Sequence, residues 1–390
     1  MGTSIKQAKN EILNTLNVYF KKKPDGSYAY PLARQRPIAL IGPAGVGKTE
    51  IVEQAAREAG VNFVSYSITH HTRQSAIGLP AIKDSVFGGK EMKCTEYTMS
   101  EIVGRVYSEA ERTGIKEGIL FLDEFNCASD TLAPAVLQLL QYKSFGPHRL
   151  PDGWMIVLAG NDRKYNKSVR PMDAVTRDRL RVINVVPSVA EWVEYASKNG
   201  VHPIVISYIK QKPNFLYSFN PESEELSIVT PRAWEDLSMM LLAYEDSGYP
   251  VSGDTVEQYL ADKRISRDFY AQYELYSKYT GDAMLRRILS GGAAAKDINA
   301  VREYSYDKLY AVASVLGRLC ELKCADSEND CKKSEEAAAV IRNTLAFADK
   351  AFGNSGAREL IVNSFLSSAA VTAVLAETKS SDVVAMLCSA

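Results

Sequence analysis

Residues 41–50 read IGPAGVGKTE. Within this stretch Gly42, Gly47, Lys48 and Thr49 match the phosphate-loop pattern GxxxxGK[ST]. An apolar run, PIALIG at 37–42, precedes the loop, and a helical pattern over 47–59 follows it. Glycines let backbone N–H groups curl around phosphate oxygens, and the N-terminus of a helix adds partial positive charge. The stretch therefore predicts a nucleotide-phosphate site between a buried strand and a helix.

The predicted nucleotide-binding residues are those of the loop and the first helical turn: Gly42, Pro43, Ala44, Gly45, Val46, Gly47, Lys48, Thr49 and Glu50. We expect Lys48 to reach the β- and γ-phosphates of ATP, and Thr49 to place its hydroxyl on Mg²⁺. A bare strand-to-helix turn would not require Lys and Thr after the last glycine. The motif therefore favours a bound ATP with Mg²⁺.

A second stretch, GILFLDEFN at 118–126, bears on whether the phosphate is cleaved. Its apolar residues predict a buried strand that ends in Asp123 and Glu124. At that position Asp123 can hold Mg²⁺, and Glu124 can activate a water molecule as a general base. The alternative is a helix cap or a pair of solvated charges.

Further polar residues follow two later strands. Asn161 ends the run WMIVLAGN at 154–161, where it can orient the attacking water or touch the γ-phosphate; otherwise it starts a turn. The stretch DAVTRDRLRV at 173–182 carries Arg177, Arg179 and Arg181 before the next apolar run. An arginine inserted into a neighbouring subunit's nucleotide site stabilises transition-state charge, whereas the alternative is a solvated basic helix end.

The stretch VTPRAW at 229–234 predicts the start of a helix, with Thr230 as N-cap and Pro231 at the first helical position. This places Arg232 in the first turn, where the helix dipole disfavours a positive charge. A phosphate partner would explain an arginine there, although a merely exposed arginine remains the alternative.

The order of these elements predicts the fold class. Five continuous apolar runs alternate with helical stretches, at 37–42, 62–68, 118–124, 154–161 and 181–187. Continuous apolar runs are typical of parallel strands covered on both faces. We therefore expect an α/β domain over residues 1–187, with a helix at 4–21 opening the chain.

After residue 187 the patterns are helical only. Ser188 and Glu191 form a predicted capping box at the start of a helix. We divide this part into a helical domain at 188–280 and a helical extension at 281–390.

Composition limits the partners. Lys and Arg number 46 against 47 Asp and Glu, so the net charge is −1 and gives no general attraction to nucleic acid or to anionic membranes. No apolar run is long enough for a membrane span, and the N-terminus does not have the pattern of a signal peptide. We expect a cytoplasmic protein with no membrane partner.

Together these motifs resemble an AAA+ ATPase, a P-loop NTPase with a central parallel five-stranded sheet and an all-α lid. The resemblance covers about residues 30–245. It is most specific for the MoxR-type branch, close to the dynein-related AAA family, over LQLLQYKSFGPHRLPDGWMIVLAGN at 137–161. Residues 42–49 resemble Walker A, and Asp123 with Glu124 resembles Walker B. Asn161 is similar to sensor 1.

Two arginines complete the resemblance. Arg179, within RDRL, is similar to the arginine finger, and Arg232 is similar to sensor 2. The family usually has an aromatic residue after the finger, where this chain has Leu180, so either Arg177 or Arg179 can hold that role. Whether Arg232 acts on its own subunit's ATP or on a neighbour's also stays open.

The resemblance further implies a ring, usually a hexamer, with ATP between subunits. It implies a partner with a von Willebrand factor A-type domain, and a role in remodelling a client protein or in maturing a metal cofactor. The segment at 70–91 occupies the place of the helix-2 insertion, a loop that contacts partners or the pore; its His70 and His71 are expected to be loop residues and not metal ligands.

Three functions therefore compete. The first is an ATP-hydrolysing, ring-forming remodelling ATPase. The second is a nucleic-acid motor or switch on the same fold, with the hairpin candidate YKSFGPHRL at 142–150 contributing Lys143, His148 and Arg149. The third is a scaffold that binds ATP without useful turnover.

Overall fold

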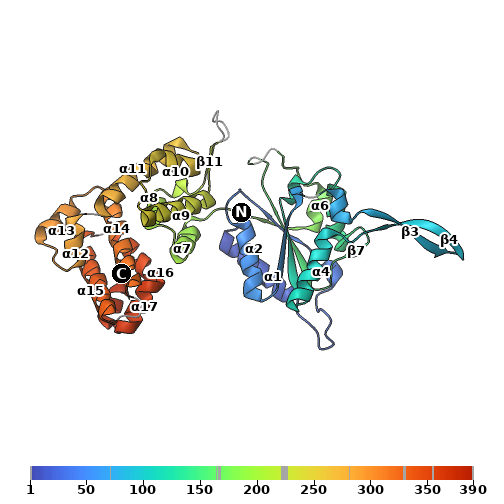
Figure 1. Cartoon of the computed structure of the whole chain (residues 1–390), viewed down its shortest axis with the longest axis horizontal. Coiled ribbons are helices and arrows are strands. Elements are labelled where there is room, and N and C mark those ends of the chain that lie inside the picture. Colours follow the sequence, from blue (N-terminus) through green and yellow to red (C-terminus); the bar gives the residue numbers. More distant parts are fainter. Residues whose placement is uncertain are drawn as a thin grey trace. The chain divides into compact units, whose positions relative to one another are not determined.

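The computed structural model describes residues 2–70, 72–163, 165, 168–220, 227–280, 282–327, 331–353 and 355–388. Figure 1 shows an α/β part followed by a helical part. The chain divides into two compact units, residues 1–188 and 189–390, which are described separately below.

A five-stranded sheet forms the centre of the first unit. Its strands are β1 (Ile38–Ile41), β2 (Asn62–Ser67), β5 (Gly118–Asp123), β8 (Trp154–Gly160) and β9 (Arg181–Asn184). Their spatial order is β2-β5-β8-β1-β9, and every neighbouring pair is parallel. The predicted parallel five-stranded α/β sheet is confirmed. All seven residues of β8 are buried, because this strand is central and covered on both faces.

Helices cover the two faces of this sheet. Figure 1 shows α1 and α2 on one face, and α4 and α6 on the other. The helical elements of the unit are α1 (Ile5–Tyr19), η1 (Leu32–Arg34), α2 (Lys48–Ala59), η2 (Ile68–His70), α3 (Arg73–Ile77), α4 (Glu101–Thr113), η3 (Phe125–Cys127), α5 (Ala133–Tyr142) and α6 (Ala174–Arg179). The predicted opening helix is α1. It is held to β9 by an ion pair between Glu11 and Arg181.

The register of the sheet brings the polar strand ends together. Ile41, which precedes the phosphate loop, pairs with Gly160, which precedes Asn161. On the other side of the sheet Asp123 pairs with Ser67, at the end of β2. Because parallel strands end at one edge, the loop after each strand opens toward the same side.

Two antiparallel hairpins project from this unit. The longer, β3 (Pro80–Phe87) with β4 (Lys90–Tyr97), is turned by Gly88 and Gly89, both at positive φ. The segment predicted as an insertion loop at 70–91 is thus a short helix followed by most of an exposed hairpin. Two glycines between alternating residues are the sequence signal for such a turn. The shorter hairpin pairs β6 (Ser144–Phe145) with β7 (His148–Arg149), as predicted near residues 142–150.

The second unit is mainly helical. Its helices are α7 (Val189–Lys198), α8 (Pro203–Gln211), η4 (Pro213–Phe215), α9 (Pro231–Ser247), α10 (Gly253–Tyr259), α11 (Lys263–Thr280), α12 (Ala283–Leu289), α13 (Ala295–Arg302), α14 (Tyr306–Ala325), α15 (Cys331–Ala351), α16 (Ala357–Ser367), α17 (Ala369–Thr378) and α18 (Ser381–Cys388). The prediction of helices alone was wrong at one place, because β10 (Ser218–Asn220) and β11 (Ser227–Val229) form a short antiparallel pair. Three-residue strands are too short to leave a periodic signal in the sequence.

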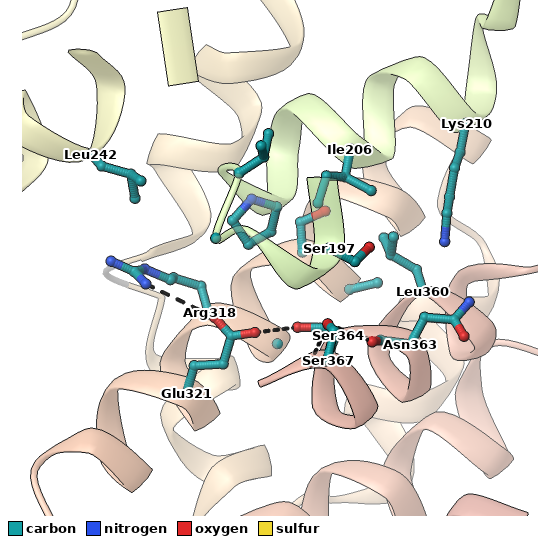
Figure 2. Close-up of a pocket in the computed structure, with 16 residues that line it drawn as sticks. Ser197, Ile206, Lys210, Leu242, Arg318, Glu321, Leu360, Asn363, Ser364 and Ser367 are labelled. Atoms are coloured by element: carbon teal, nitrogen blue, oxygen red, sulfur yellow. Dashed lines mark hydrogen bonds and ion pairs between the residues drawn. The ribbon is translucent and has the colours of Figure 1, made fainter. Parts of the chain in front are cut away.

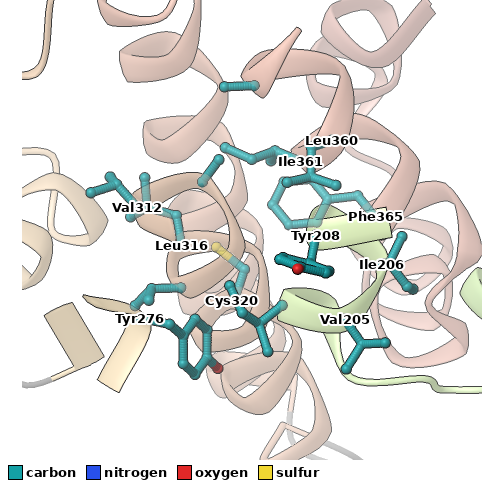
Figure 3. Close-up of a cluster of buried hydrophobic side chains, with 14 of the residues drawn as sticks. Val205, Ile206, Tyr208, Tyr276, Val312, Leu316, Cys320, Leu360, Ile361 and Phe365 are labelled. Carbon is teal, nitrogen blue, oxygen red and sulfur yellow. The ribbon is translucent and has the colours of Figure 1, made fainter. Parts of the chain in front are cut away.

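One hydrophobic core joins the helices of the second unit. Figure 3 shows Tyr208 of α8 among side chains of α14 and α16, including Leu316 and Phe365. Trp234 of α9 and Phe269 of α11 pack against the Tyr208 ring, with ring centroids 5.4 and 5.2 Å away. The core contains residues from both sides of position 280. The predicted boundary there between a lid domain and an extension is therefore not marked by a separate core, and it stays a prediction.

Among the described residues, no single helix is long and apolar enough to cross a membrane. The pair α16 and α17 passes that test together by length and composition, but it is bent by 78°. Its apolar residues Leu360, Ile361, Phe365 and Val374 are buried in the core of the second unit.

Candidate functional site

The phosphate loop takes a shape that depends on its glycines. Gly45 and Gly47 have φ of 71° and 91°, a region that side chains other than glycine rarely adopt. A Cβ atom on Gly42 would lie 2.5 Å from the carbonyl oxygen of Val185, so only glycine lets the loop leave β1 beside the end of β9. The N-terminus of α2 then opens directly onto the loop, with N–H groups that have no partner inside the helix.

The other predicted loop residues divide into lining and exposed positions. Pro43 and Val46 are buried, whereas Ala44 is half-buried. Glu50 is exposed in the first turn of α2, where its carboxylate accepts a hydrogen bond from Gln54 Nε2 at 2.8 Å. No contact in the described structure tests whether these residues touch a nucleotide, so that part of the site stays a prediction.

Lys48 lies inside the curl of the loop. Its side chain is buried, and the ammonium donates to the carbonyl oxygens of Gly42 at 3.0 Å and Pro43 at 2.7 Å. It also donates to Asn161 Oδ1 at 3.0 Å. The ammonium is thus held beside the loop, where a phosphate could accept charge-assisted hydrogen bonds from it.

Thr49 and Asp123 form the second polar contact of the site. The Thr49 hydroxyl donates to Asp123 Oδ2 at 3.1 Å, and Asp123 Oδ1 accepts the backbone N–H of Glu124 at 2.8 Å. A hydroxyl and a carboxylate are oxygen ligands of the kind that Mg²⁺ prefers when phosphate oxygens complete its shell. These two residues therefore fit the predicted magnesium site.

Glu124 stands on a strained turn at the end of β5. It has φ of 53° and ψ of 32°, which is uncommon for a residue with a side chain and is often retained at functional sites. Its carboxylate oxygen Oε2 accepts from Thr69 Oγ1 at 2.9 Å and from Ser67 Oγ at 3.4 Å. The carboxylate is thus oriented by two hydroxyls, one on the last residue of β2 and one in η2, and the sequence interpretation missed both. Their signal was two hydroxyl residues at the end of the predicted strand 62–68.

Asn161 lies between the two halves of the site, because β8 lies between β1 and β5. Its side chain contacts Lys48, and its backbone carbonyl accepts from Asn126 Nδ2 at 2.7 Å. Asn126 is buried in the turn after Glu124, and it too was missed by sequence reasoning. The sequence contains it as the last residue of LDEFN, where nothing in the local pattern distinguishes it from a loop residue.

The three arginines near the end of the first unit have different surroundings. Arg181 is engaged by α1 through Glu11 and through Thr15 Oγ1, which accepts at 2.8 Å. Arg179 is half-buried, and its Nη1 donates to the Val175 carbonyl at 2.8 Å. The side chain of Arg177 is exposed and, among the described residues, it forms no hydrogen bond or ion pair; its backbone N–H donates to the Asp173 carbonyl at 3.0 Å at the start of α6. No described hydrogen bond from Arg177 or Arg179 leads to Lys48 or Glu124 of the same chain.

Arg232 belongs to the second unit. Thr230 caps α9 by accepting from the backbone N–H of Ala233 at 3.2 Å, and Pro231 is the first helical residue, as predicted. Arg232 is exposed in this first turn. Its role toward a nucleotide stays a prediction.

The basic residues of the short hairpin are largely engaged within the protein. Lys143 donates to Gln35 Oε1 at 2.6 Å and to the Trp154 carbonyl at 2.8 Å, and burial lowers its pKa to about 8. The His148 ring lies 2.8 Å from the Thr98 carbonyl oxygen. Only Arg149 of the three is exposed, with Asp152 3.7 Å away. The hairpin therefore does not present the basic surface that binding of nucleic acid would require.

A cavity of about 80 Å³ lies within the second unit, among α7, α8, α14 and α16 (Figure 2). Polar side chains that line this cavity contact one another. Glu321 Oε1 accepts a hydrogen bond from Ser364 Oγ, and Glu321 Oε2 lies 3.9 Å from Arg318 Nη1. Burial raises the pKa of Glu321 and lowers that of Lys210, which also lines the cavity. The contacts of Glu321 with Ser364 and Arg318 are part of the packing between α14 and α16.

A strand, a glycine loop with lysine, a helix and an acidic strand end at one sheet edge define a P-loop nucleotide-binding domain. Residues 37–180 match the family described as AAA domain, dynein-related subfamily. These residues are therefore an AAA domain of that subfamily, and the resemblance seen in the sequence is confirmed at this level. Membership of the MoxR-type branch stays a prediction.

Two curated relatives share the similarity. The mouse ATPase family gene 2 protein homolog B is 29% identical over 156 residues, which are 40% of this chain and 15% of the relative. The rat protein of the same name is 31% identical over 129 residues, 33% of this chain and 13% of the relative. The match thus spans only about a seventh of those proteins.

Solved structures of two RuvB mutants from Thermotoga maritima are also similar. They share 13% and 12% identity, with TM-scores of 0.37 and 0.35. The alignments cover 65% and 66% of this chain, and 67% and 71% of theirs. The fold assignment rests on the strand order and the phosphate loop.

Proposed function

We propose that the first unit binds ATP and hydrolyses its terminal phosphate. The observation that carries this proposal is the meeting of three strand ends, where Lys48 contacts Asn161 and Thr49 contacts Asp123. In this reading Lys48 holds the β- and γ-phosphates and Asn161 orients the attacking water or the γ-phosphate. Glu124 accepts the proton of that water as general base.

Mg²⁺ is the proposed cofactor, with Thr49 and Asp123 as the residues that would hold it or its water shell. When bound, the ion supplies positive charge that offsets the charge on the phosphate oxygens. Removal of Mg²⁺ with a chelator should abolish turnover and weaken ATP binding.

We further propose that the chain works as a ring, usually a hexamer in this family, with a neighbour completing each site. The support is the arrangement within one chain, since the hydrogen bonds described for Arg177 and Arg179 do not lead to its own Lys48 or Glu124. Arg179, or Arg177 in its place, would then reach the ATP of the adjacent subunit. Arg232 would contact the nucleotide from its own lid or from a neighbour's.

The resemblance to the MoxR-type branch supports a finer proposal. The ring would remodel or mature a partner protein, with a von Willebrand factor A-type protein as the candidate partner and an unidentified client. No observation on the described residues favours a nucleic-acid motor, given that Lys143 and His148 are engaged internally.

Phosphate release tests hydrolysis directly. Wild-type protein should release phosphate from Mg-ATP, whereas Glu124→Gln should bind ATP with similar affinity and lose about 10²–10⁴-fold in kcat. Glu124→Gln turning over at the wild-type rate would reject the assigned base. Wild-type protein that binds ATP without turnover would instead support the scaffold reading.

A mixing experiment tests the shared site. Arg179→Ala and Lys48→Ala should each be inactive, and the mixture should regain activity because one subunit supplies the arginine and its neighbour the intact loop. Arg177→Ala, mixed in the same way, determines which arginine acts. A mixture that stays inactive with both arginine variants, or an active monomer, would contradict the ring.

A further inference from the structure

Asn126 connects the two polar strand ends of the site through its side chain. It lies in η3, two residues after Glu124, and its Nδ2 donates to the backbone carbonyl of Asn161 at 2.7 Å. Its own carbonyl accepts the backbone N–H of Arg170 at 2.9 Å. One buried residue thus fixes the turn after β5, the end of β8 and the segment that leads toward α6.

The space for the Asn126 amide depends on Gly160. A Cβ atom at Gly160 would lie 2.6 Å from Asn126 Oδ1 and 2.8 Å from its Cγ, so any side chain there would displace the amide. Gly160 has no positive φ in this structure, and its role is therefore to leave room for its neighbour. Because Gly160 has no side chain, the Asn126 amide has the space it needs to reach the Asn161 carbonyl.

The amide of Asn126 is poorly explained by stability alone. Its Oδ1 is buried, and no partner is recorded for it in the described part of the chain. An unsatisfied buried acceptor is unfavourable for folding, whereas an apolar side chain of the same size would carry no such penalty. The feature gained by the asparagine is the donated hydrogen bond to Asn161.

We propose that Asn126 is a positioning residue for ATP hydrolysis, acting through Asn161; this inference rests on the proposed function. Asn126 holds the Asn161 backbone at one spacing from the turn that carries Glu124. The Asn161 amide, which reaches Lys48, and the Glu124 carboxylate then face the γ-phosphate and its water from fixed positions. Without the hydrogen bond from Asn126 to the Asn161 carbonyl, the end of β8 can shift, and small displacements of positioned groups reduce rates strongly.

The test compares Asn126 variants with a matched control. Asn126→Ala and the near-isosteric Asn126→Asp both remove the donor, and each should lower kcat by about 10- to 100-fold while KM changes by less than about threefold. The control is Asn62→Ala, which removes a comparable hydrogen bond, from Asn62 Nδ2 to the Ile115 carbonyl at 2.8 Å. Asn62 is the first residue of β2, whereas the hydroxyl of Ser67 beside Glu124 is on the last. This control should lower the melting temperature without lowering kcat.

A double-mutant cycle tests the link to Gly160. Gly160→Ala alone should reduce kcat, because its methyl group displaces the Asn126 amide. In Gly160→Ala/Asn126→Ala the methyl group has room, so the double variant should be no slower than Asn126→Ala. Effects that multiply would mean that the two residues act independently and would overturn the inference.

The outcomes separate this inference from the proposed function. A wild-type protein without ATPase activity rejects the proposed function and the inference with it. If the wild type is active, Glu124→Gln is inactive and Asn126→Asp keeps the wild-type kcat, the proposed function stands and only the role of Asn126 is rejected. If Asn126→Ala is too unstable to assay, Asn126→Asp and the Gly160→Ala variant carry the test.

Discussion

The Lys48 ammonium donates a hydrogen bond to Asn161 Oδ1 at 3.0 Å, although 113 positions separate the two residues in the chain. The contact exists because β8 is inserted between β1 and β5 in the sheet. Asn161 therefore contacts the loop lysine through its side chain and, through its backbone carbonyl, Asn126 in the turn that follows the acidic strand end.

Substitution of Asn161 should separate catalysis from binding. We expect Asn161→Ala to lower kcat by about 10²-fold, the typical effect of losing one positioned polar group, with little change in KM. Asn161→Asp should also raise KM, because a carboxylate would pair with Lys48 and repel the γ-phosphate. Steady-state kinetics of the two variants measure this difference, and equal KM values for both would contradict the contact with the phosphate.

The hydroxyls beside Glu124 should restrain its carboxylate. Thr69→Val removes the 2.9 Å hydrogen bond to Oε2, and bonds to charged groups are worth about 1.5–3 kcal/mol. We expect basal phosphate release to rise by about tenfold, because Glu124 turns more often toward the nucleotide. Ser65→Ala, at an exposed position of the preceding strand β2, should have no effect. A lower rate in Thr69→Val would mean that the hydroxyl orients Glu124 for reaction.

Three glycines should respond differently to alanine. Gly42→Ala places a methyl group 2.5 Å from the Val185 carbonyl oxygen, so it should lower both the melting temperature and the ATP affinity. Gly47→Ala has open space but a φ of 91°, so it should distort the loop and weaken ATP binding. Gly60→Ala, at φ 66° in open space at the end of α2, should lose about 1 kcal/mol of stability and keep its affinity. Thermal melts and nucleotide titrations measure both quantities.

Lys143 should make stability depend on pH in the alkaline range. Burial lowers its pKa in the folded protein to about 8, from an ordinary value of 10.5. The unfolded chain therefore binds more protons between these two values, and the free energy of unfolding rises with pH across that window. The free-energy cost of burying the charged Lys143 side chain is fully present below about pH 8, and at most it lowers the free energy of unfolding by roughly 3 kcal/mol.

The measurement compares wild type with Lys143→Met by denaturant unfolding from pH 7 to 10.5. The wild type should gain stability relative to the variant as pH rises, because only the wild type relieves a buried charge. Since Lys143 also donates two hydrogen bonds, the sign of the difference at pH 7 is not the test. A pH-independent difference would mean that Lys143 keeps an ordinary pKa.

The local signals in the sequence were sufficient for the phosphate loop and the acidic strand end. GxxxxGKT has a backbone shape that requires glycine, and GILFLDE combines a buried strand with a charged end. The Thr230 cap of α9 could also be predicted from the sequence, because capping depends on neighbouring residues only. These features depend on local sequence, so no tertiary information was needed.

Other features depend on residues that are distant in the chain. The hydroxyls that hold Glu124 belong to the last residue of β2 and to η2, and the donor that holds Asn161 lies in η3. The core that joins residues from both sides of position 280 likewise forms only when α8, α11, α14 and α16 pack together. Periodicity indicates that a helix has an apolar face, but not which helix covers it.

The sequence by itself determined which residues can carry the chemistry: Lys48 and Thr49 after the glycines, Asp123 and Glu124 at a strand end, and Asn161 after the next buried strand. The tertiary structure decided how they meet, by placing β8 between β1 and β5 and by setting Asn126 against Gly160. The physical reason is that residue types and turns follow from local chemistry, whereas strand order and side-chain clamps follow from packing across the whole sheet.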